Sequence, residues 1–293
     1  MHPRFAKPFE TLSAPLQAAL LPMLGDDFQA RFTPEQVATL KAATGLDDRA
    51  LRLALLPLAA ACSVAPISRF FVGAIACGLS GSWYFGANME LAGQGLFHSV
   101  HAEQSAISNA WLGGETGISE ITVNYTPCGH CRQFMNELST AKTLKVSLPD
   151  DLSELQSFLP PSFGPADLEI TDALMSPQAH DELVLESDDP LWQAALAAAR
   201  QSYAPYSQGY AAVALQFEDG RIFCGRYAEN AAFNPSLPPM QMACAHAVLN
   251  GEELTTVRRA VLLESKSGQI SQRDSAQSTL KALGRVELEY QAV

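Results

Sequence analysis

Residues 71–86, FVGAIACGLSGSWYFG, predict two neighbouring strands joined by a tight turn. Residues 71–77 form a compact apolar run, and residues 78–82 supply the glycines and serines that a turn requires. A second apolar run begins at Trp83. This segment is therefore expected to form a β-hairpin with both strands in a hydrophobic core.

The chain beyond the hairpin alternates helices with strands. Apolar side chains recur at helical spacing over residues 101–112, and residues 121–125 predict a third strand. A further helix is expected from Cys128 to about residue 138, followed by a strand over residues 145–148. The order β-β-α-β-α with one more strand indicates an α/β layered fold.

The unit around the hairpin occurs again 139 residues further along the chain. Ala65-Pro66-Ile67-Ser68 falls on Ala204-Pro205-Tyr206-Ser207 at this offset. Further matches at the same offset are Gly81 with Gly220, Gly86 with Gly225, Glu90 with Glu229, and Ala92 with Ala231. The constant spacing predicts two copies of one domain.

Two other segments flank the copies. Residues 1–62 are expected to be helical, with a capping box at Thr33 and Gln36 and a helix start at Asp47 or Asp48. The segment between the copies is rich in Pro, Asp, Glu and Ser and predicts a connector, with a stiff strap over residues 158–165. The expected divisions are residues 1–62 (helical region), 63–150 (first copy), 151–189 (connector) and 190–293 (second copy).

Composition narrows the class of protein. The 293 residues are 47% hydrophobic and 17% charged, as in a folded globular chain, and the net charge of −12 argues against nucleic acid as a partner. The longest apolar run, residues 53–67, is interrupted by prolines and is shorter than the roughly 20 residues of a membrane span. Residues 1–8 lack the apolar run of a signal peptide. We therefore expect a cytoplasmic protein with reduced thiols and no membrane partner.

One group of residues has the composition and spacing of a zinc site. His101-Ala102-Glu103 is followed by Pro127-Cys128-Gly129-His130-Cys131, so that one imidazole and two thiols offer three zinc ligands. Three protein ligands leave the fourth tetrahedral position open, as a catalytic zinc requires. Both cysteines are expected where a helix begins, a position that favours the thiolate. Glu103 lies two residues past His101 and is placed to carry a proton.

Two other interpretations of the cysteine pair remain open at this point. The pair is also the pattern of a redox-active dithiol. A closed structural zinc site would need a fourth ligand, for which His130 is the candidate, although it lies between the two cysteines. His98 is expected to be a polar loop residue. The remaining cysteines, expected to be small core residues, are Cys62, Cys77, Cys224 and Cys244.

His-Ala-Glu with Pro-Cys-x-x-Cys resembles the signature of the zinc-dependent deaminases. Segments 70–74, 86–90, 100–106 and 126–131 resemble cytidine deaminase, and segment 228–235 resembles the degenerate second copy of the long, homodimeric bacterial form. The resemblance implies duplicated three-layer α-β-α domains, each a mixed sheet with helices on both faces, preceded by a small helical region.

The resemblance also implies an activity and a cofactor. One Zn²⁺ per chain would be bound by His101, Cys128 and Cys131. A zinc-bound hydroxide would attack C4 of cytidine or deoxycytidine, with Glu103 as proton shuttle, and ammonia would leave, a reaction of pyrimidine salvage. The implied substrate contacts are Asn88 and Glu90 with the sugar hydroxyl, Phe70 with the base, Ala102 and Thr126 with the base edge, and Phe163 in the partner subunit's site.

The second copy lacks these ligands. At the 139-residue offset, Met240 replaces His101 and Met242 replaces Glu103. The other replacements are Tyr227 for Asn88, Ser267 for Cys128 and Ile270 for Cys131. The second copy is therefore expected to be a non-catalytic scaffold.

Two other functions are compatible with parts of this sequence. A deaminase acting on a base within RNA or DNA would share the zinc signature, but the negative charge and the pair Asn88 and Glu90 disfavour it. A zinc-stabilised interaction protein without activity would have no use for Glu103.

Overall fold

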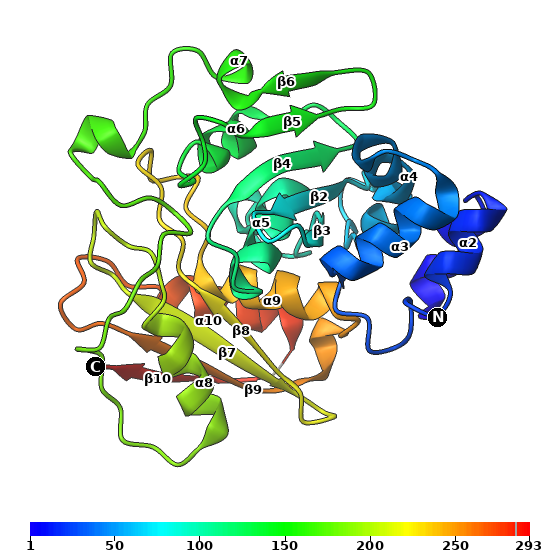
Figure 1. Cartoon of the computed structure of the whole chain (residues 1–293). Coiled ribbons are helices and arrows are strands. Elements are labelled where there is room, and N and C mark those ends of the chain that lie inside the picture. The colour runs from blue at the N-terminus through cyan, green and yellow to red at the C-terminus, as the bar shows by residue number, and fades with distance from the viewer. Residues whose placement is uncertain (285) are drawn as a thin grey trace.

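The computed structural model describes residues 1–284 and 286–293 and contains two sheets, each belonging to one half of the chain (Figure 1). The first sheet has the strand order β1-β3-β2-β4-β5-β6. Its strands β2, β3 and β4 are antiparallel neighbours, whereas β4 and β5 run parallel, so the sheet is mixed as expected. Its strands are β1 (Arg31–Phe32), β2 (Gly73–Gly78), β3 (Trp83–Ala87), β4 (Ile118–Val123), β5 (Lys145–Ser147) and β6 (Leu152–Glu154).

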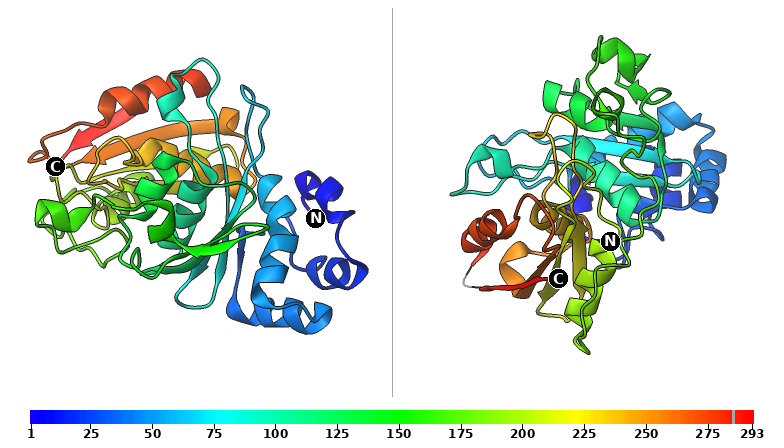
Figure 2. Two further views of the ribbon diagram at one scale, coloured as in Figure 1. Left: turned by 90° about the horizontal axis from the view of Figure 1, so that it is seen from above. Right: turned by 90° about the vertical axis from the view of Figure 1, so that its left-hand side faces the viewer.

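The second sheet repeats the central part of the first. Its order is β10-β9-β7-β8, with β7 antiparallel to β8 and β9, and β9 parallel to β10. The expected duplication is confirmed, and Figure 2 shows the two halves side by side. The strands of the second sheet are β7 (Ala211–Phe217), β8 (Ile222–Arg226), β9 (Val257–Glu264) and β10 (Leu288–Ala292).

Helices cover both faces of each sheet. In the first half, α4 packs on the face to which Gly73 belongs, and α5 packs on the opposite face at Gly86. In the second half, α8 and α9 take the corresponding places, and α5 contacts α9 between the two sheets. The helices are α1 (Ala6–Phe9), α2 (Ala14–Leu20), α3 (Pro34–Thr44), α4 (Asp48–Ala60), α5 (Ala102–Leu112), α6 (Gly129–Met135), α7 (Leu155–Phe158), α8 (Pro190–Ala199), α9 (Pro239–Leu249) and α10 (Arg273–Leu283), with short 3₁₀ turns at Pro3–Phe5, Leu96–His98, Pro165–Leu168 and Leu254–Thr256.

A close approach of helix to strand recurs in the two halves. A Cβ atom on Gly86 would lie 2.1 Å from the backbone nitrogen of Ala106 in α5. A Cβ atom on Gly225 would lie 2.3 Å from the backbone nitrogen of Ala243 in α9. Any side chain at either glycine would push the helix off the sheet, because such contacts are far below van der Waals distance.

The structure corrects the alignment of the second copy. His101 is the residue before α5, and Pro238 is the residue before α9, so the offset in these helices is 137 residues. Pro238 therefore takes the place of His101, and Met240 takes the place of Glu103. The offset returns to 139 in β9, because loops absorb insertions and deletions that paired core strands do not.

The cysteine positions are corrected in the same way. Cys128 precedes α6 and Gln272 precedes α10, so Gln272 and Ser275 correspond to the two cysteines in place of Ser267 and Ile270. Neither correction restores a zinc ligand set.

Several expected boundaries also change. β1, from the region expected to be helical, pairs with β3, and β6, from the expected connector, pairs with β5. β4 covers residues 118–123 in place of 121–125, and α6 ends at Met135. The capping box at Thr33 and Gln36 and the cap at Asp47 are confirmed.

No helix in the described part of the chain combines the length and the apolar character needed to cross a membrane.

The N-terminal segment is attached to the second half by Arg4. Its guanidinium nitrogens donate to the carbonyl oxygens of Val248 and Leu249, each at 2.6 Å. These carbonyls belong to the last turn of α9, where backbone N–H donors run out, although Val248 also accepts from the N–H of Gly251 at 3.1 Å. Arg4 therefore caps a helix of the other half.

We predict that Arg4→Met lowers the free energy of unfolding by about 1 to 3 kcal/mol, because two carbonyls lose charged donors. Urea unfolding followed by circular dichroism measures the change. Lys7→Met, at an exposed position close by, is the control and should leave the midpoint unchanged. Equal midpoints for the two variants would contradict the capping role.

Candidate active site

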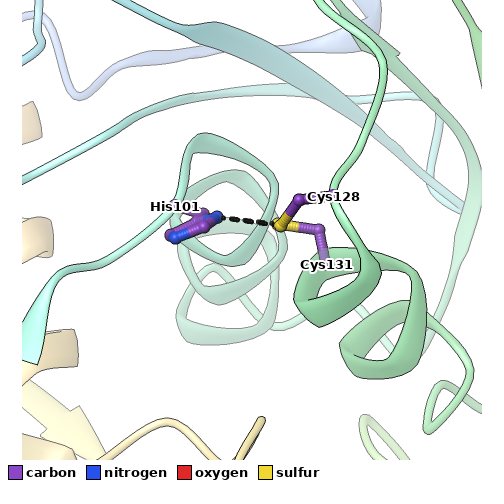
Figure 3. Close-up of side chains that lie close together, drawn as sticks. All are labelled: His101, Cys128 and Cys131. Atoms are coloured by element: carbon purple, nitrogen blue, oxygen red, sulfur yellow. Dashed lines mark hydrogen bonds between the residues drawn. The ribbon is translucent and has the colours of Figure 1, made fainter. Parts of the chain in front are cut away.

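Two helix starts bring the predicted zinc ligands together (Figure 3). His101 immediately precedes α5, and the side chain of Gln104 accepts a hydrogen bond from the backbone N–H of His101 at 3.2 Å. Cys128 immediately precedes α6, and Cys131 lies in the first turn of that helix. The expectation that both cysteines lie where a helix begins is confirmed.

The geometry of the three side chains fits a metal ion. Nδ1 of His101 lies 3.3 Å from Sγ of Cys128 and 3.2 Å from Sγ of Cys131, and the two sulfurs are 3.7 Å apart. Tetrahedral zinc with ordinary bond lengths places such ligand atoms roughly 3.6 to 3.8 Å apart. Within residues 1–284 and 286–293, His101, Cys128 and Cys131 form the group whose ligand atoms are close enough together to bind a metal ion. His130 does not belong to this group.

This arrangement decides between the interpretations of the cysteine pair. Each sulfur is nearer to the imidazole nitrogen than to the other sulfur, which favours a metal site over a dithiol redox pair. The ring of His130 lies with its centroid 5.3 Å from that of His101, beside the ligand set and outside it. The side chains therefore do not form a closed site with His130 as the fourth ligand.

The pKa shifts of Cys128 and Glu103 fit a metal ligand and a proton carrier, respectively. Hydrogen bonds from Cys131 and His101 lower the pKa of Cys128 to about 3, so its sulfur is a thiolate, the form that binds metal. Glu103 is only 4% exposed, and burial raises the pKa of its carboxyl group. A carboxylate with a raised pKa is a stronger base than an ordinary one, as a group that takes a proton from water needs to be.

A cavity of about 570 Å³ opens beside the ligands. Glu103 lines it together with His101 and Cys128, so the open side of the ligand set faces the cavity and the acid. The cavity thus brings together most of the residues predicted from the sequence. The predicted residues that line it are Phe70, Asn88, Glu90, His101, Ala102, Glu103, Thr126 and Cys128.

Elsewhere in the cavity lining, backbone groups hold a carboxylate and an amide. Glu90 accepts hydrogen bonds from the backbone N–H groups of Ile67 at 2.9 Å and Ser68 at 3.0 Å, and from the Ser68 hydroxyl. Burial alone would raise the pKa of Glu90, but these hydrogen bonds outweigh burial and lower it. Glu90 is therefore an ionised acceptor held in one orientation.

Asn88 is fixed by the segment that precedes β2. Its amide donates to the carbonyl oxygen of Phe70 and accepts from the N–H of Val72, both at 2.9 Å. An amide nitrogen carries two hydrogens, so one donor stays available to a ligand. Asn88 and Glu90, two residues apart on an extended segment, face the same cavity as expected.

Several lining residues were not predicted. Tyr125 stacks at a tilt on Phe70 with ring centroids 4.5 Å apart, and Leu96 lies at the rim. Adjacency to Thr126 was a signal for Tyr125, whereas Leu96 carried no sequence signal. The remaining unpredicted residues are Ile67, Ser68, Val72, Ser99 and Val100.

Phe163 does not line the cavity of its own chain. Its carbonyl oxygen accepts from Gln133 at 2.8 Å and from Asn136 at 2.9 Å, so its backbone is tied to α6 and the residue that follows it. Its side chain is 45% exposed. The expected residue 158–165 strap therefore lies beside the cysteine helix and presents an aromatic ring to the outside.

Comparison with known proteins identifies the domain twice. A sequence profile described as the cytidine and deoxycytidylate deaminase zinc-binding region matches residues 46–147, and a second profile with the same description matches residues 155–277. A cytidine deaminase of Aeromonas hydrophila is 92% identical over the full length of both chains. A cytidine deaminase of Shewanella amazonensis is 54% identical, over 100% of this chain and 99% of its own. The crystal structure of a Burkholderia pseudomallei cytidine deaminase, 30% identical, covers 40% of this chain and all of its own, with a TM-score of 0.36.

We predict that Cys128→Ala loses most of its zinc, falling from about one ion per chain to below about 0.3, because two protein ligands hold zinc poorly. Metal analysis of purified, dialysed protein measures the content. Cys224→Ala removes a thiol of the second half and is the control, expected to keep its zinc. Full zinc content in Cys128→Ala would show that this sulfur is not a ligand.

Proposed function

The chain belongs to the cytidine and deoxycytidylate deaminase family, and from this membership we propose how its residues carry out the reaction. It is a zinc-dependent hydrolase that deaminates cytidine. The observation that carries the assignment of roles is one cavity lined by ligands of a three-ligand metal site, by a buried glutamate and by a second carboxylate held by hydrogen bonds.

We propose that His101, Cys128 and Cys131 hold the zinc ion. Two thiolates and one neutral imidazole balance its charge. Zinc bound there supplies a Lewis acid that makes a water acidic enough to lose a proton near neutral pH. The protein's part is to place three ligands and keep the remaining side open to the cavity.

Glu103 is proposed as the proton shuttle. It takes one proton from the attacking water and gives it to N3 of the pyrimidine. It then carries the second proton, from the hydroxyl now bonded to C4, to the amine as the C4–N bond breaks, so that cytidine and water become uridine and ammonia. Burial favours its protonated form, which makes it an effective donor once the first proton has been taken.

Asn88 and Glu90 are proposed to bind the sugar. The free amide hydrogen of Asn88 and the fixed carboxylate of Glu90 complement a hydroxyl group, which both donates and accepts. A negative charge at this position repels a phosphate group. The proposed substrates are therefore the nucleosides cytidine and deoxycytidine, and nucleotides are disfavoured.

The base is proposed to lie against the aromatic wall. Phe70 and Tyr125 form this wall, and the backbone of Ala102 and Thr126 faces the base edge from the helix start and from the segment before Cys128. The competing functions have less support, since a base within RNA or DNA would meet a protein of net charge −12 and a carboxylate at the sugar position.

We further propose that the enzyme is a cytoplasmic homodimer in pyrimidine salvage. Exposed aromatic rings at Phe97, Phe163 and Phe233 are apolar surface of the kind that a partner subunit covers. Phe163 would reach the partner subunit's site. In this proposal residues 63–150 form the catalytic domain and residues 190–293 the scaffold domain.

We predict that Glu103→Gln keeps its zinc but loses activity by about 10²- to 10⁴-fold or more, because the amide cannot carry the proton. Ammonia release from cytidine and metal analysis are measured on the same sample. Glu115→Gln, which alters another buried glutamate, is the control and should stay active. Turnover of Glu103→Gln within about tenfold of the unaltered enzyme would rule out the shuttle role.

The cross-subunit role of Phe163 predicts complementation. A mixed dimer of one Phe163→Ala chain and one Glu103→Gln chain contains one site with both an intact Glu103 and a partner's Phe163. Its activity should reach about half that of the unaltered dimer, whereas each variant alone is impaired. If Phe163 acts within its own chain, mixing restores nothing.

A further inference from the structure

One wall of the cavity is the loop between β3 and α5. Leu96, Ser99 and Val100 of this loop line the cavity. Leu96 is 72% exposed and Phe97 is 83% exposed, so little of the first half packs against the tip of the loop. The position of this wall therefore depends on what holds residues 94–98.

The side-chain hydrogen bonds from these residues lead to the half without zinc ligands. Nε2 of Gln241 in α9 lies 2.7 Å from Nδ1 of His98. The hydroxyl of Thr279 in α10 lies 3.2 Å from the same nitrogen. The hydroxyl of Ser278 donates to the side-chain oxygen of Gln94 at 2.7 Å. The second half thus anchors the wall from two helices.

The contact between Gln241 and His98 has a counterpart made by the equivalent residues. At the helical offset of 137 residues, Gln241 corresponds to Gln104 and Pro235 corresponds to His98. Nε2 of Gln104 donates to the carbonyl oxygen of Pro235 at 3.3 Å. Each of these equivalent glutamines thus forms a hydrogen bond to the other half. Of the two, Gln241 is the one that contacts the loop lining the substrate cavity.

The hydrogen bond to His98 is buried and specific. Gln241, His98 and Thr279 are all buried. An amide N–H that donates to Nδ1 requires the neutral imidazole with its proton on Nε2, and burial lowers the pKa of His98, which favours that form. Loss of one partner would leave a buried polar group without a hydrogen bond and would release the loop.

The loop is separated from the zinc ligand by a short strand contact. Val100 and Met89 exchange two backbone hydrogen bonds, at 2.8 and 2.9 Å, between His98 and His101. This pair holds His101 in place when the loop shifts. Displacement of the loop should therefore move Leu96 and the substrate-binding wall, and leave the metal site as it is.

We propose that Gln241, from the half without zinc ligands, is a positioning residue for the deaminase site, acting through His98 on the loop that carries Leu96. The inference rests on the proposed function. It assigns the second half a direct effect on substrate binding in its own chain. Because the affected group binds substrate and does not take part in proton transfer, the effect should appear in KM and not in kcat.

The test is a double-mutant cycle with Gln241→Met, His98→Leu and the combined variant, assayed with cytidine. Each single change should raise KM by about 5- to 20-fold, with kcat within about threefold of the unaltered enzyme. The combined variant should have a KM no higher than that of the more affected single variant. Zinc content should stay at the level of the unaltered enzyme in all three.

Ser202→Ala is the matched control, because it removes a buried hydrogen bond of 2.7 Å to Ala199 within the second half, away from the loop. It should leave KM unchanged even where it lowers thermal stability. An unchanged KM in Gln241→Met would overturn the inference. So would a combined variant in which the two single increases in KM multiply.

Ser278→Ala tests the same wall through Gln94 should Gln241→Met fail to fold. Its KM should rise by about 2- to 5-fold, and an unchanged KM would again overturn the inference. Failure of the unaltered enzyme to deaminate cytidine would instead contradict the proposed function, so the two failures are distinguishable.

Discussion

The close packing of α5 on β3 at Gly86 is the contact on which the site depends. It sets the distance of α5 from the sheet, because no side chain fits between the strand and the backbone of Ala106. The same sheet leads through β4 into the segment that ends at Cys128. The same sheet therefore positions His101 and both cysteines. The cysteines lie 27 and 30 residues beyond His101 in the chain, yet the three ligand atoms lie within 4.8 Å of one another.

The second half has kept this architecture without its chemistry. Gly225 repeats the close packing, and Glu229 accepts from the N–H groups of Tyr206 and Ser207 as Glu90 does from Ile67 and Ser68. Where His101 and Glu103 would stand, Pro238 and Met240 leave only apolar groups. Met240 is part of the core shared by the two halves, where α9 packs against α5.

The second half also supports the catalytic half from another direction. Glu137, shortly after the cysteine helix α6, is buried and accepts from the hydroxyl of Tyr203 at 2.8 Å and the N–H of Ala231 at 2.9 Å. These hydrogen bonds lower the pKa of Glu137, but burial raises it by more, so that the pKa is raised overall. Loss of chemistry in one copy thus left a surface shaped to hold the helices of the other.

Local patterns in the sequence were sufficient to predict the hairpin, the duplication, the grouping of His101, Cys128 and Cys131, and the position of Glu103 beside them. Turn glycines, short motifs and repeated strings can each be recognised within a few neighbouring residues. The loop lengths of the second copy, the edge strands β1 and β6, and the cavity wall at Leu96 appeared only in the folded chain. So did the bond between Gln241 and His98, which joins residues 143 apart. Such pairings depend on how two sheets and their helices pack, and residues so distant along the chain carry no shared periodicity or motif that would reveal their contact.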